Sequence, residues 1–211
     1  MIKELIESKC IQTGNFQLKN GQMSKYYYNM KKLISFSDLL KKIGDQIYKE
    51  LGDFDIICGI PYGGLPIATY ISTTYNKPMI IVREDKKKYG TKEQIEGNYY
   101  INSRCVIIDD VITSGKSIQN VIDILKDKVT IVKFYSIFDR QQNYECSMKV
   151  ECLYCKNDVV KYRLDKIKKE KNSDLCFSAD LSDYSKLWKI IEEIGKKIVC
   201  CKIHFDTVEE E

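Results

Sequence analysis

Two adjacent carboxylates, Asp109 and Asp110, close an apolar run in the stretch CVIIDDVITSGKS at residues 105–117. A small hydroxylated turn ending in Gly-Lys-Ser follows them, which suggests a loop that binds nucleotide triphosphates. Such a loop needs a glycine, then four residues, then Gly-Lys-Ser or Gly-Lys-Thr. Counting back from Gly115, that first glycine should stand where this chain has Asp110. The triphosphate interpretation therefore fails at its most constrained position.

The same residues suit a ribose that carries one phosphate. Adjacent carboxylates can accept hydrogen bonds from a vicinal diol and can favour a nearby metal ion or a developing positive charge. Backbone N–H groups at the start of a helix bind a single phosphate, and here they would come from Thr113, Ser114, Gly115, Lys116 and Ser117. An ordinary strand-turn-helix connection with capping Thr and Ser is the alternative, because these residue types are common there.

Buried strands that alternate with helices must position these residues. Apolar runs predict strands, and helical spacing or capping signals predict the helices between them. The strands are expected at 54–60, 78–82, 105–110 and 129–138, and the helices at about 65–75 and 114–126. This alternation predicts an α/β fold with a parallel sheet covered on both faces. Ligands of such sheets bind at the carboxyl ends of the strands, where Asp109 and Asp110 stand.

The segment before the sheet predicts a small separate arrangement. Residues 2–9 suggest a short amphipathic helix, and FQLKNGQMSKYYYNMK suggests two strands around an Asn-Gly turn. Ser37 is the expected N-cap of a helix that runs to about Leu51.

The remaining segments are a loop and a tail. Residues 84–97 are charged, glycine-punctuated and without periodicity, which predicts a long surface loop of the kind that forms functional lids. One edge strand is expected after Arg140, followed by a basic helix or linker at 161–172. The tail predicts a βαβ unit with strands at 175–180 and 198–206 and a helix at about 182–196. We expect domains at 1–160 and 174–211, joined by a linker at 161–173.

Composition limits the class of protein. The 211 residues are 44% hydrophobic and 30% charged, with a net charge of +4, as in ordinary globular proteins. That charge permits an anionic small ligand but predicts no nucleic-acid partner. No apolar run approaches the roughly 20 residues of a membrane span, and MIKELIESK lacks the apolar centre of a signal peptide. We therefore expect a cytoplasmic protein without a membrane partner.

Nine cysteines raise the question of a metal site. Four of them stand in or beside apolar runs and are expected to be small core residues, namely Cys10, Cys58, Cys105 and Cys176. Cys152 and Cys155 form a CxxC pair near Cys146, but structural zinc needs four ligands. The other pair, Cys200–Cys201, would point to opposite faces of a strand. Reduced structural thiols are the prediction, with zinc or a redox role as alternatives.

VIIDDVITSGKS resembles the ribose-phosphate signature of the type I phosphoribosyltransferases, which take the ribosyl group from phosphoribosyl pyrophosphate (PRPP). The resemblance implies a central, mainly parallel sheet flanked by helices, with a small N-terminal hood. It also implies that Asp109 and Asp110 act in catalysis and that PRPP is bound by residues of this stretch, namely Asp109, Asp110, Val111, Ile112, Thr113, Ser114, Gly115, Lys116 and Ser117.

Other segments resemble orotate phosphoribosyltransferases, in the same order along residues 10–142. FQLKNG is similar to that family's FTLKSG, and YYYN, GIPYGGLPIA and FDR follow. The resemblance implies that Lys19 contacts PRPP and orotate and that Tyr62 contacts PRPP. It implies an orotate site made by Lys19, Tyr27, Tyr28, Thr113 and Arg140. An arginine fork suits the orotate carboxylate, which purine and uracil substrates lack.

The charged loop REDKKKYG follows the family pattern RKExKDxG only in part. Arg83, Lys87 and Tyr89 fall on the family's PRPP-binding positions, and Lys87 would neutralise charge on departing pyrophosphate as a catalytic residue. Glu84 replaces a lysine, and Gly63 stands where bacterial members have another lysine, so rate is more in question than reaction type. The resemblance also implies Mg²⁺ carried mainly by PRPP, with no direct protein ligand assigned, and a homodimer.

The tail segments NSDLCFSADLS and KIHFD resemble the opening of the orotidine 5′-phosphate decarboxylase domain of bifunctional UMP synthases. Asp180, Lys202 and His204 fall in this short resemblance. The decarboxylase's DxKxxD segment and most strands of its (β/α)8 barrel have no counterpart, so we expect an incomplete βαβ tail without decarboxylase activity. Two rival functions remain open: a phosphoribosyltransferase for another base, and a PRPP-binding regulatory protein.

Overall fold

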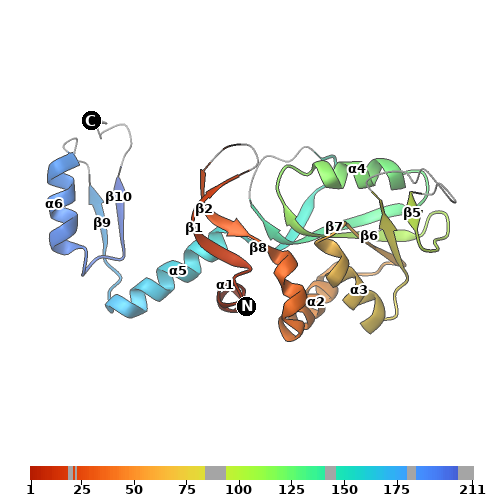
Figure 1. The fold of residues 1–211 in the computed structure, drawn as a ribbon, viewed down its shortest axis with the longest axis horizontal. Coiled ribbons are helices and arrows are strands. Elements are labelled where there is room, and N and C mark those ends of the chain that lie inside the picture. Colours follow the sequence, from red (N-terminus) through yellow and green to blue (C-terminus); the bar gives the residue numbers. More distant parts are fainter. Residues whose placement is uncertain (19–20, 22, 84–93, 141–145, 180–183, 204–211) are drawn as a thin grey trace. The chain divides into compact units, whose positions relative to one another are not determined.

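The computed structural model describes the chain apart from residues 19–20, 22, 84–93, 141–145, 180–183 and 204–211 (Figure 1). The chain divides into two compact units, Met1–Lys156 and Asn157–Glu211. The first unit contains the described residues of the predicted site.

A six-stranded sheet forms the centre of the first unit, in the order β5-β4-β3-β6-β7-β8. Its strands are β3 (Ile56–Gly59), β4 (Met79–Val82), β5 (Ile95–Glu96), β6 (Arg104–Ile112), β7 (Thr130–Asp139) and β8 (Val150–Cys155). All neighbouring strands are parallel except β4 and β5. The expected mainly parallel sheet is therefore confirmed.

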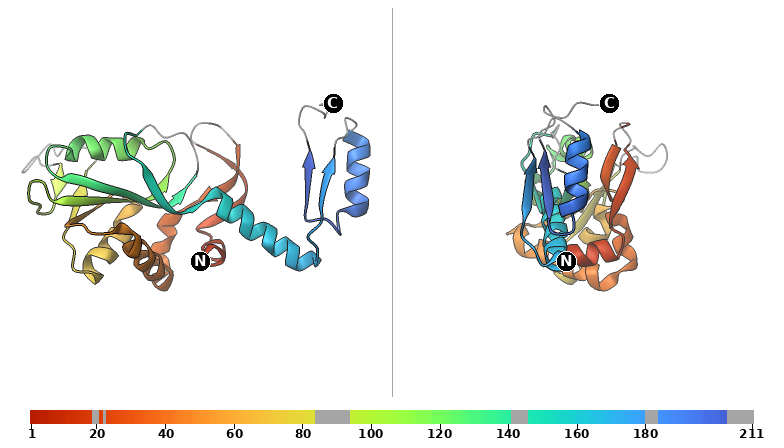
Figure 2. Two further views of the ribbon diagram at one scale, coloured as in Figure 1. Left: turned by 180° about the vertical axis from the view of Figure 1, so that it is seen from behind. Right: turned by 90° about the vertical axis from the view of Figure 1, so that its left-hand side faces the viewer.

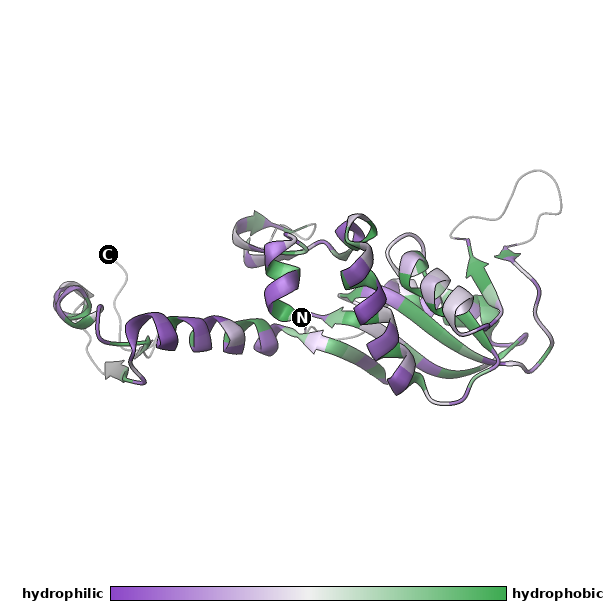
Figure 3. Ribbon diagram, turned by 90° about the horizontal axis from the view of Figure 1, so that it is seen from below, coloured by the Kyte–Doolittle hydropathy of each residue, from purple (hydrophilic) through white to green (hydrophobic). Residues whose placement is uncertain are grey.

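Helices cover both faces of this sheet, as the apolar strands require. Figure 1 and Figure 2 show α4 (Lys116–Leu125) on one face and α2 (Ser37–Leu51) with α3 (Gly64–Thr74) on the other. All four residues of β3 are buried, and the strands of the sheet are the most hydrophobic part of the ribbon in Figure 3. Successive strand residues face opposite sides, so Cys105 and Ile107 pack with α4 in one core.

The N-terminal segment forms the predicted helix and hairpin. Helix α1 (Ile2–Glu7) precedes the antiparallel strands β1 (Ile11–Gln17) and β2 (Met23–Tyr28), and a 3-10 helix, η1 (Met30–Ser35), leads into α2. The Ser37 prediction was wrong, because Ser37 is already the first helical residue and Phe36 holds the cap position. The Phe36 carbonyl accepts from the Leu40 N–H at 2.9 Å, without a side-chain cap.

Two details of the central sheet differ from the sequence prediction. The helix expected from residue 114 begins at Lys116. Gly115 holds its N-cap position with φ 80°, and this left-handed conformation is not helical, so the turn extends through Gly115 before the helix starts. The surface loop expected over 84–97 ends in β5, a two-residue strand too short for a periodic pattern. Gln94 lies beside β4, where its carbonyl accepts from the Arg83 N–H at 2.9 Å.

The segment after Arg140 contains the predicted edge strand, β8, and then a helix. The sequence predicted either a basic helix or a linker at 161–172, and most of this segment belongs to helix α5 (Lys156–Lys171). In the second unit, β9 (Cys176–Ala179) and β10 (Cys200–Ile203) pair in parallel, and α6 (Tyr184–Ile194) connects them. The predicted βαβ order is confirmed, although parts of the expected strands and helix lie outside the described residues.

Three of the four cysteines predicted to be core residues are buried, namely Cys10, Cys58 and Cys105. Burial raises the pKa of Cys58 to about 12, so this thiol stays protonated and inert. The prediction for Cys176 was wrong, because it is exposed on β9 next to Cys200, with 3.0 Å between their sulfur atoms. Among the described residues, no three His, Cys, Asp or Glu side chains gather as a metal site.

No helix within the described ranges is both long and apolar enough to cross a membrane.

Asp45 joins α2 to α3 and makes stability depend on pH. Its Oδ1 accepts from the hydroxyls of Tyr70 and Tyr75 at 2.6 and 2.7 Å, and these bonds lower the pKa of Asp45. A lowered folded-state pKa stabilises the protein above the unfolded pKa, and this contribution is lost as the pH falls through the folded pKa. Urea unfolding of wild type and Asp45→Asn should therefore give a stability difference that shrinks as the pH falls below about 5 and through the lowered pKa of Asp45. A constant difference would contradict this role.

Candidate active site

The two acids lie at the carboxyl end of β6, where the sheet should present a ligand site. Asp109 and Asp110 are 8% and 7% exposed, and the Asp110 N–H donates to Asp109 Oδ1 at 2.8 Å. Burial raises the pKa of Asp109 well above its ordinary value, and the adjacent Asp110 charge raises it further. The two side chains also contact each other, since a side-chain hydrogen bond with Asp110 contributes to the raised pKa of Asp109. The Asp110 carboxylate lies against Gly63, just before α3.

The turn between β3 and α3 packs directly against this acid pair. A β-carbon at Gly63 would overlap the carboxylate of Asp110, and one at Gly64 would overlap the carbonyl oxygen of Ile108. Gly63 thus allows the acid to lie against the turn. Tyr62, a predicted PRPP contact in this turn, is 79% exposed.

The turn after β6 has the form expected of a phosphate site. Thr113 and Ser114 are half-buried, Gly115 adopts its left-handed conformation, and Lys116 and Ser117 are exposed in the first turn of α4. Backbone N–H groups at such a helix start favour an anion. Val111 and Ile112 still belong to β6. The Ile112 side chain is 1% exposed in the core, so it can contact a ligand through its backbone only.

A cavity of about 250 Å³ joins the two turns to β4. The lining residues that were predicted to bind PRPP are Arg83, Lys116 and Ser117, and Pro61 comes from the turn before Tyr62. Arg83 forms an ion pair with Glu96 at 2.9 Å. Asn120 also lines the cavity, one helical turn after Lys116, and sequence reasoning missed it. Its spacing from Lys116 and Ser117 was the signal that could have found it.

Tyr28 and Arg140 come together at the end of β7. The Tyr28 ring stacks on Phe138 with 4.0 Å between ring centroids, and the Arg140 guanidinium carbon lies 5.9 Å from the Tyr28 centroid. Burial raises the pKa of Tyr28 to about 12, so its hydroxyl stays protonated. The Arg140 N–H donates to the Ile112 carbonyl at 3.3 Å, which places Arg140 beside Thr113. These three predicted orotate contacts therefore lie near the acid pair.

Tyr27 lies on the other face of the hairpin. It stacks on Phe16 at 5.4 Å and is 43% exposed, whereas Tyr26 stacks on Tyr28 at 6.3 Å. Alternation along β2 gives this result, since adjacent strand residues point in opposite directions. The structure thus places Tyr26, rather than Tyr27, on the side of Tyr28.

Several predicted residues have no described side chain. Lys19, Glu84, Lys87, Tyr89, Asp180 and His204 lie outside the described residues, and of Lys202 only the backbone is described, paired with Ser178.

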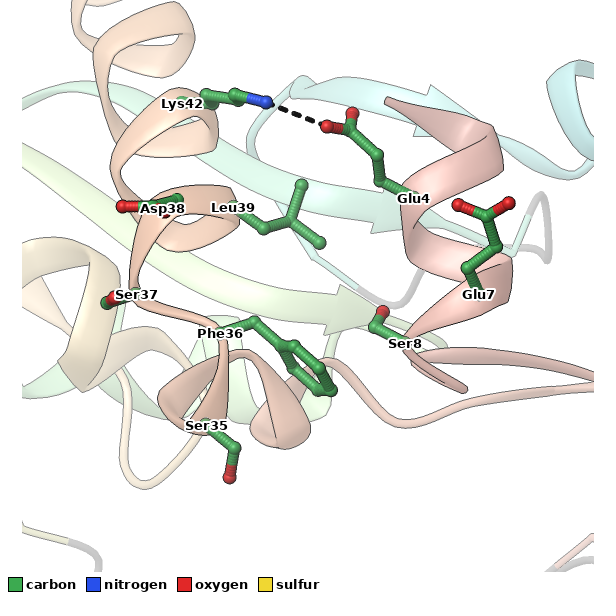
Figure 4. A pocket seen from close by; sticks show the side chains of 9 residues that line it. All are labelled: Glu4, Glu7, Ser8, Ser35, Phe36, Ser37, Asp38, Leu39 and Lys42. Atoms are coloured by element: carbon green, nitrogen blue, oxygen red, sulfur yellow. Dashed lines mark hydrogen bonds and ion pairs between the residues drawn. The ribbon is translucent and has the colours of Figure 1, made fainter.

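A larger hollow of about 520 Å³ lies between α1 and the start of α2 (Figure 4). It is lined by Glu4, Glu7, Ser8, Ser35, Phe36, Ser37, Asp38, Leu39 and Lys42, and the Lys42 ammonium pairs with Glu4 at 2.8 Å. None of the predicted site residues lines it. Size alone would therefore select a cavity that contains none of the predicted site residues.

Residues 25–166 match the phosphoribosyl transferase domain family. The chain belongs to this family. The phosphoribosyl transferase domain is 38% identical over 152 residues to an orotate phosphoribosyltransferase of Methanosphaera stadtmanae, covering 71% of this chain and 85% of that protein. Over its full length, the chain is 26% identical to the bovine uridine 5′-monophosphate synthase and covers 58% of that protein.

A solved structure of a UMP synthase has the same fold as this phosphoribosyl transferase. The structure of Leishmania donovani UMP synthase superposes with a TM-score of 0.68 at 25% identity, covering 92% of this chain and 41% of that one. The chain thus spans less than two thirds of the bovine and Leishmania synthases.

Proposed function

We propose that this chain transfers the 5-phosphoribosyl group from PRPP to orotate, which gives orotidine 5′-phosphate and pyrophosphate and serves UMP biosynthesis. The observation that carries the proposal is the placement of Arg140 over the Tyr28 ring, beside the turn that follows Asp109 and Asp110. A planar base with a carboxylate needs an aromatic face and a guanidinium, and a ribose needs the acids. The similarity to orotate phosphoribosyltransferases supports this choice of base.

Different residues bind different parts of the two substrates. The turn at 113–117 holds the 5′-phosphate through backbone N–H groups, and Asp109 and Asp110 accept hydrogen bonds from the ribose hydroxyls. Arg83 and Lys116, which line one cavity, supply positive charge for the pyrophosphate. Arg140 and Tyr28 hold orotate by its carboxylate and ring.

Positioning and charge complementarity carry the reaction. The bond from C1 of the ribose to pyrophosphate lengthens, positive charge develops at the ring, and N1 of orotate attacks from the opposite face. The carboxylates of Asp109 and Asp110 stabilise that positive charge without forming a covalent bond. Lys87 is proposed to neutralise the departing pyrophosphate, with Lys19, Tyr62 and Tyr89 as further PRPP contacts and Lys19, Tyr27 and Thr113 as further orotate contacts.

Mg²⁺ is part of the proposal as a companion of PRPP. The oxygens of Asp109 and Asp110 are hard donors of the kind that Mg²⁺ prefers, and Mg²⁺ usually binds through one or two carboxylates plus substrate phosphates. When bound, the ion would neutralise charge on the pyrophosphate.

We also infer a cytoplasmic homodimer. The family resemblance supports the dimer, since in that family the charged loop crosses to the neighbouring site. For the chain itself we propose a catalytic domain at 1–160, a linker at 161–173 and a decarboxylase-like fragment at 174–211. These 211 residues lack a DxKxxD segment, so no decarboxylation is expected.

One assay tests the proposed function directly. The protein is mixed with PRPP, Mg²⁺ and orotate, and the loss of orotate absorbance is followed, with reactions lacking PRPP as the control. We expect turnover with orotate and little with uracil or hypoxanthine. Turnover only with uracil or hypoxanthine would reject orotate as the substrate. PRPP binding without turnover on any base would indicate a regulatory protein instead.

A further inference from the structure

Lys31 places a positive charge on the acid pair from outside the sheet. It belongs to η1, directly after the hairpin, and its ammonium lies 3.5 Å from Asp110 Oδ2. The Lys31 side chain is 60% exposed, whereas that of Asp110 is 10% exposed. Lys31 is far in sequence from the stretch that contains Asp109 and Asp110, so the motif in that stretch gave no reason to select it.

The surroundings of the acid pair make this contact important. Gly63 and Gly64 face the pair from the turn before α3, and Ser136 lies opposite Asp109 on β7. None of these carries a charge. Among the described residues, Lys31 alone forms an ion pair with either carboxylate.

Stability is a weak reason for this ion pair. A lysine this exposed is screened by water and gains little from a single carboxylate. Its geometric effect is more specific, because the ammonium contacts one oxygen of a largely buried carboxylate. The contact therefore fixes the place of the Asp110 carboxylate, whose oxygens can accept hydrogen bonds from a ribose diol.

We propose that Lys31 is a positioning residue of the ribosyl transfer, whose ammonium holds the Asp110 carboxylate beside Gly63 and so orients the acid pair toward the ribose hydroxyls. This inference rests on the proposed function, because it assigns a partner to the acids of that same site. Lys31 acts through Asp110 and needs no contact with the reacting atoms.

The test compares three variants of the full chain: Lys31→Met, Lys31→Arg and Lys42→Met. Lys42 is the matched control, since it is 58% exposed and forms a surface ion pair with Glu4 away from the acids. For Lys31→Met we expect kcat/KM for PRPP to fall about tenfold, as for residues that orient a binding group, with KM for orotate unchanged. Lys31→Arg should restore most of the loss, and Lys42→Met should match wild type.

Rescue and the division between KM and kcat separate positioning from a merely structural role. If Lys31 orients the acid pair, Lys31→Met changes KM for PRPP and kcat while KM for orotate stays in place, and Lys31→Arg recovers most of the loss. Thermal unfolding of each variant verifies that it is folded. A loss that Lys31→Arg does not recover, or an equal loss in Lys42→Met, would overturn the proposal.

The two proposals fail in different ways. If wild type uses another base, orotate is wrong, and the same comparison is made with that base. If wild type turns over no base, calorimetric titration with PRPP replaces kinetics. Weaker PRPP binding by Lys31→Met, recovered in Lys31→Arg, would then support the role of Lys31, and equal binding would reject it.

Discussion

Gly63→Ala is expected to lower kcat/KM for PRPP by about 100-fold while the protein remains folded. The added methyl group would occupy the space of the Asp110 carboxylate, so that acid must move. Gly63 has φ −74° and ψ −34°, which alanine adopts without strain. The loss therefore comes from displacement of Asp110, and a displacement of about 1 Å in a reacting group can cost this much.

A double-mutant cycle with Asp110→Ala tests this cause. Once the carboxylate is gone, the three atoms nearest to the added methyl group are absent, so Gly63→Ala should add little further loss in that background. Steady-state kinetics on the four proteins measure the coupling, and thermal unfolding serves as the folding control. Additive losses would mean that Gly63 acts on catalysis by another route.

Arg140→Ala is expected to raise KM for orotate about 100-fold, because removing one partner of a hydrogen-bonded charge pair leaves the other without compensation. The guanidinium lies 5.9 Å from the Tyr28 ring, so the same variant also removes a cation from the aromatic face. Arg140→Lys should recover part of the affinity, since it keeps the charge but loses the planar fork.

Uracil provides the internal control for Arg140, because it has the pyrimidine ring but no carboxylate. The ratio of kcat/KM for orotate to that for uracil should fall in Arg140→Ala, while KM for PRPP stays near its wild-type value. An unchanged ratio would show that another group binds the carboxylate.

Long, apolar stretches were the predictable part of this fold. The buried runs of β3, β6 and β7 indicated parallel strands, and the prediction that Asp109, Asp110 and the turn at 113–117 lie at a carboxyl end of the sheet is confirmed. Boundaries were less predictable because single backbone conformations set them. Gly115 delays the start of α4 by two residues relative to the expected residue 114, and Phe36, which lacks a capping side chain, takes the cap position expected of Ser37.

The contacts of the site depended on tertiary structure that no local pattern contains. Lys31 and Asp110 are far apart in sequence and meet only because η1 lies against the end of β6. Alternation along β2 could have shown that Tyr27 and Tyr28 point to opposite faces, but the family resemblance treated them as a pair. The Gly63–Asp110 contact likewise needs both the turn and the strand to be placed.

The packing of Asp110 between two segments has an evolutionary consequence. The turn before α3 lies against its carboxylate at Gly63, and η1 pairs with it through Lys31. A shift of either segment would move the acid, so the residues that place the turn and those that place η1 vary under a common constraint. Compensating changes in this lineage should therefore pair residues of these two segments, which are far apart in sequence.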